Sequence, residues 1–80
     1  MNNKRRKAIT QIMNELDILK NEIETLKDEE QEYFDNMPES FQGGAKGEKE
    51  EGIISELEDA WNSLDDCLTS LGNSIDTDAY

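Results

Sequence analysis

The chain has 80 residues with a single cysteine, no histidine and a formal net charge of −12. This length allows at most one small domain, and the composition excludes both a disulfide framework and a structural zinc site. Self-association is therefore expected to supply stability that a small core lacks. Residues 1–7 carry four cations and no acid, whereas residues 8–80 carry four lysines and all 20 acids, a balance of −16. Such a body repels DNA, RNA and anionic lipid and attracts basic protein grooves, so we expect no direct nucleic-acid binding.

The cellular location is predicted from what the chain lacks. Its apolar runs are two or three residues long, far short of the roughly 20 that cross a bilayer. No apolar segment of a secretory signal follows the basic N-terminal run, and a lone thiol is typical of a reducing compartment. We therefore expect a cytoplasmic protein, in the cytosol of a host cell, without a membrane partner.

Apolar residues in the first half of the chain recur at steps of three and four. Such a heptad pattern, sustained over about four repeats, predicts a helix that packs lengthwise against another helix. Pro38 removes a backbone donor and disfavours helix at the preceding residue, so we expect this helix over residues 4–36. Its a positions are Ile9, Leu16 and Ile23, its d positions are Ile12, Leu19 and Leu26, and Tyr33 follows in register.

A second run with the same steps predicts a helix over residues 48–72. Three glycines within residues 37–47 indicate a turn before it. Gly72 is a natural helix end, which leaves residues 73–80 as a tail. The stepping positions are Ile54, Leu57, Trp61, Leu64, Leu68, Leu71 and Ile75.

Two helices joined by a short connection predict an all-α, antiparallel, coiled-coil-like hairpin that forms one domain. A flanking row at Ile53, Ala60 and Cys67 suggests that the second helix is covered on more than one side. We therefore expect a homodimer that forms a four-helix bundle, or a higher closed oligomer. The longer first helix would overhang the second at its N-terminal end. Candidate interface residues are Ile9, Ile12, Met13, Leu16 and Trp61.

A basic cluster opens the first helix, where cations oppose the helix dipole. Either this arm is solvated, or an anion occupies it together with free backbone amides, or it forms salt bridges with the acidic body of a neighbouring subunit. With an aromatic ring for stacking, it could also hold a nucleotide. The candidate anion-binding residues are Lys4, Arg5, Arg6, Lys7 and Tyr33.

Nothing in the sequence predicts catalysis, a cofactor or a metal site. The acids match no calcium-loop spacing, and Cys67 on an apolar flank has no neighbouring base to activate it. Glu30 interrupts the heptad seam and is expected to reach water or Lys49. The protein is therefore expected to be non-enzymatic. The acidic residues chosen as partner-binding candidates are Glu56, Asp59, Asp65 and Asp66.

The turn reads EYFDNMPE and is followed by a glutamine and a glycine. The positions concerned are Tyr33, Phe34, Asp35, Asn36, Met37, Pro38, Glu39, Gln42 and Gly47. With its flanks, this segment over residues 29–68 resembles small uncharacterised acidic helical proteins of phages, prophages and conjugative elements. The resemblance covers about half of the chain, and it implies a mobile-element origin without naming an activity.

Three functions are consistent with these observations. The first is a phage-type interaction protein that blocks a host or defence protein through an acidic helical surface that imitates nucleic acid. The second is an oligomeric sponge that sequesters a nucleotide immune signal, such as a cyclic nucleotide, on the basic arm. The third is a structural coiled-coil module of a phage particle or replication complex, in which charge serves only solubility.

Overall fold

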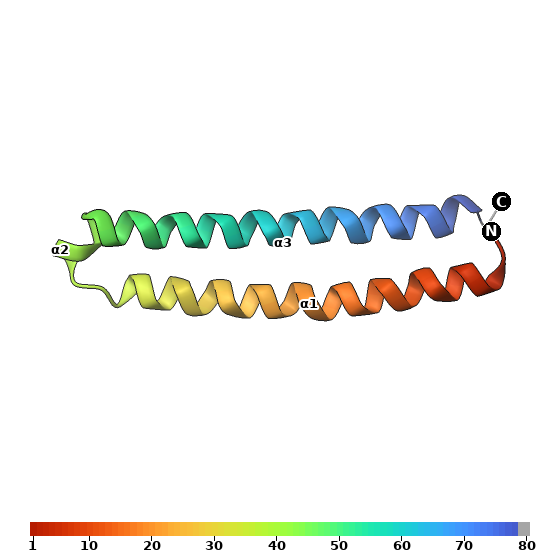
Figure 1. Ribbon diagram of the computed structural model, residues 1–80, viewed down its shortest axis with the longest axis horizontal. Coiled ribbons are helices and arrows are strands. Elements are labelled where there is room, and N and C mark those ends of the chain that lie inside the picture. Colours follow the sequence, from red (N-terminus) through yellow and green to blue (C-terminus); the bar gives the residue numbers. More distant parts are fainter. Residues whose placement is uncertain (79–80) are drawn as a thin grey trace.

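The computed structural model describes residues 1–78 as two long helices and one short helix. Helix α1 covers Asn3–Asp35, α2 covers Glu39–Gln42, and α3 covers Ala45–Asp78. Helices α1 and α3 lie side by side and antiparallel over their full lengths, with α2 at one end and the start of α1 and the end of α3 at the other (Figure 1). The hairpin is 58 Å long. The prediction of an all-α helical hairpin is confirmed.

Helices α1 and α3 meet along a narrow seam of half-buried side chains, and within residues 1–78 no apolar side chain is fully buried. The predicted stripe of α3 lies in this seam. In α1 the a row also lies there, but the d row does not. The row one residue further along the chain takes its place. This row includes Lys20 and Lys27, whose apolar stems pack between the two helices. From α1 the seam contains Ile9, Met13, Leu16, Lys20, Ile23, Lys27, Glu30 and Phe34; from α3 it contains Glu50, Ile54, Leu57, Trp61, Leu64, Leu68, Leu71 and Ile75.

The expected N-terminal overhang of the first helix is wrong. Helix α3 has 34 residues and α1 has 33, because α3 begins at Ala45 and continues past Gly72. Gly72 does not end the helix, since the half-buried Leu71 and Ile75 on either side of it carry the seam onward. A Cβ atom at Gly72 would lie 3.6 Å from the Met13 side chain, so the two helices remain in contact there. The predicted tail from residue 73 is helical to Asp78, and its last two residues lie outside the described part of the chain.

The connection is more ordered than a plain turn. The Gln42 side chain donates hydrogen bonds from Nε2 to the carbonyl oxygens of Phe34, at 3.0 Å, and Asp35, at 3.4 Å. These carbonyls belong to the last turn of α1, where helical partners are missing. Gly47 is buried beneath α2. Helix α2 therefore caps α1 and packs on α3, which defines the angle at which the chain reverses.

None of the helices in residues 1–78 is long and apolar enough to cross a membrane.

Candidate functional site

The contacts across the seam identify two different faces of the hairpin. Lys20 reaches Asp65, and Met13 lies against Gly72, on one side of the seam. Because residues seven apart share one side of a helix, Glu51 and Glu58 lie on this side with Asp65. On α1 the adjacent row, farther from the seam on the same side, contains Asp17 and Glu24. We call this side the acidic face, and it contains Asp17, Glu24, Glu51, Glu58 and Asp65.

The opposite side of the seam is apolar. At 100° per residue, the unused d row of α1 and the flanking row of α3 both project from this side. Their large apolar side chains are between 39% and 52% exposed. We call this side the apolar face, and it contains Ile12, Leu19, Leu26 and Tyr33 of α1 and Ile53, Ala60 and Cys67 of α3.

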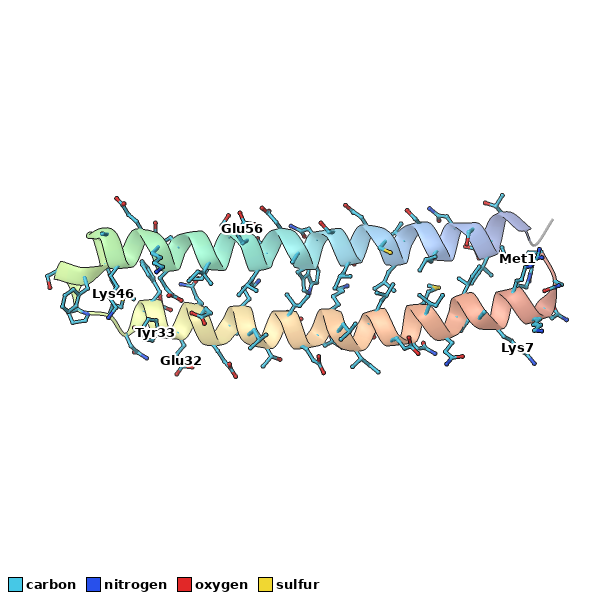
Figure 2. The ribbon with its side chains drawn as sticks, viewed as in Figure 1. Met1, Lys7, Glu32, Tyr33, Lys46 and Glu56 are labelled. Carbon is cyan, nitrogen blue, oxygen red and sulfur yellow. The ribbon has the colours of Figure 1, made fainter. Side chains whose placement is uncertain are left out.

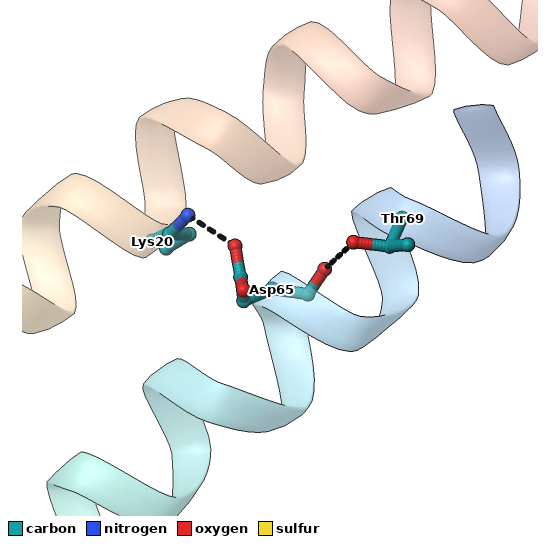
Figure 3. A network of polar contacts seen from close by, with 3 residues as sticks. All are labelled: Lys20, Asp65 and Thr69. Atoms are coloured by element: carbon teal, nitrogen blue, oxygen red, sulfur yellow. Dashed lines mark hydrogen bonds and ion pairs between the residues drawn. The ribbon is translucent and has the colours of Figure 1, made fainter.

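A polar cluster joins the two helices at the centre of the acidic face. Lys20 Nζ lies 2.7 Å from Asp65 Oδ1, and the Thr69 hydroxyl donates to the backbone carbonyl of Asp65 at 3.1 Å (Figure 3). The same ammonium lies 4.3 Å from the ring centroid of Trp61, within the range of a cation–π interaction. The Lys20 side chain is only 15% exposed, so its ammonium group stabilises the contact between the two helices and is poorly accessible to a ligand.

The structure separates the four acids chosen as a partner-binding surface. Asp65 lies on the acidic face but is paired with Lys20. Asp59 and Asp66 are exposed on the outer side of α3, which faces away from α1. Glu56 lies at the edge of the apolar face instead. The net charge of a segment does not show which side of the hairpin each acid occupies, because that depends on which rows of α3 contact α1.

The basic arm and Tyr33 lie at opposite ends of the molecule (Figure 2). The 26 residues from Lys7 to Tyr33 span about 40 Å of helix, so one chain cannot join them in a single nucleotide site. Asn2 caps the helix by accepting a 2.9 Å hydrogen bond from the Arg5 backbone N–H. Lys4 and Arg5 lie outside a depression of about 400 Å³ on α1, which is lined by Asn3, Arg6, Lys7, Thr10, Gln11 and Asn14.

Four of the five predicted oligomer-interface residues lie in the intrachain seam. They are half-buried and face the other helix of the same hairpin, while Ile12, at 46% exposed, lies on the apolar face. The expectation of a free N-terminal overhang placed Ile9, Ile12 and Met13 at an interface, and the matched helix lengths remove that overhang. The four seam residues are Ile9, Met13, Leu16 and Trp61.

Two carboxyl groups meet at the loop end of the seam. Glu30 faces Glu50 across it rather than the expected Lys49, and the Glu50 side chain is buried, at 7% exposed. The pKa of Glu50 is raised above its ordinary value, first by its hydrogen bond with Glu30, then by burial and by repulsion from the Glu30 charge. Sequence reasoning missed Glu50, although it lies four residues before Ile54, one step upstream in the same pattern.

This pair predicts a pH-dependent stability that Glu50→Gln should abolish. Because the pKa of Glu50 is raised in the folded chain, folded Glu50 keeps its proton above pH 4.5, where unfolded Glu50 releases it. The contribution of Glu50 to the free energy of unfolding is therefore fully present below pH 4.5 and is lost as the pH rises through the pKa of the folded chain. Urea unfolding followed by circular dichroism should show Glu50→Gln more stable than the wild type at pH 7 and similar to it at pH 4.

The exposed neighbour provides the control for this experiment. Glu51→Gln removes the same charge one residue away and should leave most of the pH dependence in place. Equal losses of stability between pH 4.5 and pH 7 in the wild type and in Glu50→Gln would contradict a raised pKa of Glu50.

Comparisons with family models, curated proteins and solved structures find no match to this chain.

Proposed function

We propose that the protein is a non-enzymatic interaction protein that binds and blocks a host or defence protein through its acidic face. The observation that carries this proposal is the division of the hairpin into one acidic and one apolar side. A partner with a basic groove, of the kind that binds nucleic acid, is the chemistry that the acidic face fits.

The spacing of the acids supports an extended contact. Glu51, Glu58 and Asp65 follow one another at intervals of seven residues, or about 10.5 Å along α3. Asp17 and Glu24 run parallel to them on α1, and Asp59 and Asp66 add charge along the outer side of α3. Two long helices hold these carboxylates in a line, as a nucleic-acid strand holds its phosphates. Such a line suits a basic groove better than a compact cluster would.

The resemblance of residues 29–68 to small phage and prophage proteins supplies the biological setting. An acidic protein made by a mobile element inside a host cell meets nucleic-acid-binding defence proteins with exposed basic grooves. Electrostatic attraction to such a groove speeds association and is weakened by salt. The nucleotide-sponge alternative requires more than one chain, because the basic arm and Tyr33 are far apart within a hairpin.

The proposal is tested by neutralising the exposed acids beside the seam without touching the Asp65 ion pair. The triple variant Asp17→Asn, Glu24→Gln, Glu58→Gln should retain less than about a tenth of the affinity for a host protein captured by the wild type, since three lost charge contacts of roughly 0.5 kcal/mol each amount to about tenfold. Binding is measured by calorimetry at several salt concentrations. Competition between the wild-type protein and DNA for the captured partner is measured in parallel.

A second triple variant controls for net charge. Glu15→Gln, Glu22→Gln, Glu29→Gln removes the same number of charges from the outer edge of α1, away from the acidic face. It should bind nearly as well as the wild type. Equal losses of affinity in both variants would mean that overall charge, rather than the acidic face, determines binding. Unchanged binding and an unchanged salt dependence in the first variant would refute the proposal.

A further inference from the structure

The apolar face remains uncovered in the single hairpin. Leu26 is 52% exposed, Leu19 is 49% exposed and Ile12 is 46% exposed, although burial of leucine and isoleucine side chains away from water is favourable. No apolar side chain of residues 1–78 reaches full burial in the seam. A contiguous apolar strip along a chain without a buried core is typical of an interface with another helical surface.

We propose that a second copy of the chain covers the apolar face, turned end for end, so that α1 lies antiparallel against α1 and α3 against α3. The product is a four-helix bundle whose core is formed by the apolar faces of two hairpins. This inference goes beyond the proposed function and does not depend on it. Both acidic faces remain on the outside of the bundle.

The positions on the apolar face are symmetric in the way that such a dimer requires. The row of α1 has its midpoint between Leu19 and Leu26, and the row of α3 has its midpoint at Ala60. These midpoints lie at the same height along the hairpin, because Lys20 contacts Trp61 and Glu30 contacts Glu50 across the seam. One two-fold axis through both midpoints brings Leu19 against Leu26 of the second copy and places the small Ala60 against its own counterpart.

Charge selects the reversed arrangement over the one in which both hairpins point the same way. The N-terminal end carries four cations in residues 4–7, and the loop end carries six acids within residues 28–39. Reversal lays each basic arm beside residues 35–41 of the second copy, where Asp35 and Glu39 lie. The parallel arrangement would place both basic arms at one end of the bundle and both acidic loop ends at the other, at a cost in repulsion.

The size of the face is sufficient for a stable dimer. The outline of a hairpin 58 Å long and 16 Å wide has an area of about 900 Å², which leaves room for the roughly 800 Å² per partner that standard interfaces bury. Its outer edge on α1 is polar, with Glu15, Glu22 and Glu29. An apolar centre with a polar rim is the usual organisation of protein interfaces.

Disulfide formation at the symmetry axis tests both the contact and its direction. In a Cys67→Ser background, Ala60→Cys places a thiol against its own counterpart only in the reversed dimer, and mild oxidation should give a covalent dimer in high yield. In the parallel arrangement, Ala60 of one copy faces α1 of the other and no such bond forms. Asp59→Cys in the same background lies on the outer side of α3 and should remain largely unlinked.

The mass in solution provides the independent measurement. Light scattering of the wild type should give twice the chain mass, and Leu19→Glu should raise the dissociation constant by on the order of 100-fold or more, because it buries a carboxylate in each copy. A wild-type monomer at all concentrations overturns the proposal. So does a dimer in which Ala60→Cys links no better than Asp59→Cys, since that dimer uses another face or another direction.

Discussion

Replacing Gly47 by alanine is expected to destabilise the hairpin by about 1–3 kcal/mol, although alanine is the better helix former. A Cβ atom at this position would overlap the backbone carbonyl of Gln42 and would lie 2.6 Å from the carbonyl oxygen of Phe41. These are backbone atoms that a rotamer change cannot move. Helix α2 would have to lift from α3, which would also withdraw the Gln42 side chain from the last carbonyls of α1. Chemical denaturation followed by circular dichroism measures the loss.

Gly52 provides a matched control on the same helix. A Cβ atom there meets nothing within 4 Å, so only the helix preference of alanine acts. Gly52→Ala is expected to stabilise the protein by up to about 1 kcal/mol. The two substitutions are chemically identical and lie five residues apart, so their opposite signs isolate the contact with α2. A stabilising Gly47→Ala would show that α2 is not packed on α3 in solution.

The periodicity of the apolar residues predicts both long helices and their antiparallel pairing. It does not determine which rows of α1 face α3. Helix α1 has apolar residues on two adjacent rows, and either pair of rows could form the seam. The choice depends on Lys20 and Lys27, whose stems pack and whose charges reach the edge of the seam. A reading of hydrophobicity alone counts lysine as polar and therefore places the seam one row away.

The ends of the helices were predicted less well than their middles. Gly72 is a helix terminator by local preference, but contacts of Leu71 and Ile75 across the seam outweigh that preference. The sequence marks Gly47 only as one glycine of the turn, and Gln42 only through the resemblance of that turn. Their physical roles, capping α1 and allowing α2 to approach α3, require two segments that only the folded chain brings together.

The acidic face shows the same limit for the candidate site. Its negative charge could be predicted from composition, but the particular acids that form it could not. Glu56 and Asp65 are both acids of α3, yet they belong to different sides of the hairpin. The distinction follows from the contact of Lys20 with Asp65, a pair 45 residues apart in the sequence. Long-range contacts of this kind determine which acids lie together on one side of the hairpin, and composition does not contain that information.

Trp61→Ala is expected to cost about 2–4 kcal/mol, somewhat less than for a fully buried tryptophan because the side chain is half-buried. The stability of an 80-residue domain is roughly 4–12 kcal/mol, so this change alone approaches unfolding. The ring is the largest apolar group of the seam and also the surface on which the Lys20 ammonium rests at 4.3 Å. Without it, a poorly exposed cation retains only Asp65 as a partner. Thermal and urea unfolding by circular dichroism measure the effect.

Trp61→Phe separates the two contributions of the side chain. Phenylalanine keeps an aromatic face for Lys20 and removes an indole N–H that is buried without a hydrogen-bond partner. The cost should therefore be about 1 kcal/mol, since most of the packing survives. Lys20→Met in the wild-type and Trp61→Ala backgrounds then reports how strongly the cation and the ring are coupled, expected at about 0.5–1 kcal/mol. A Trp61→Phe variant as unstable as Trp61→Ala would mean that the size of the indole, rather than its aromatic face, holds the centre of the seam.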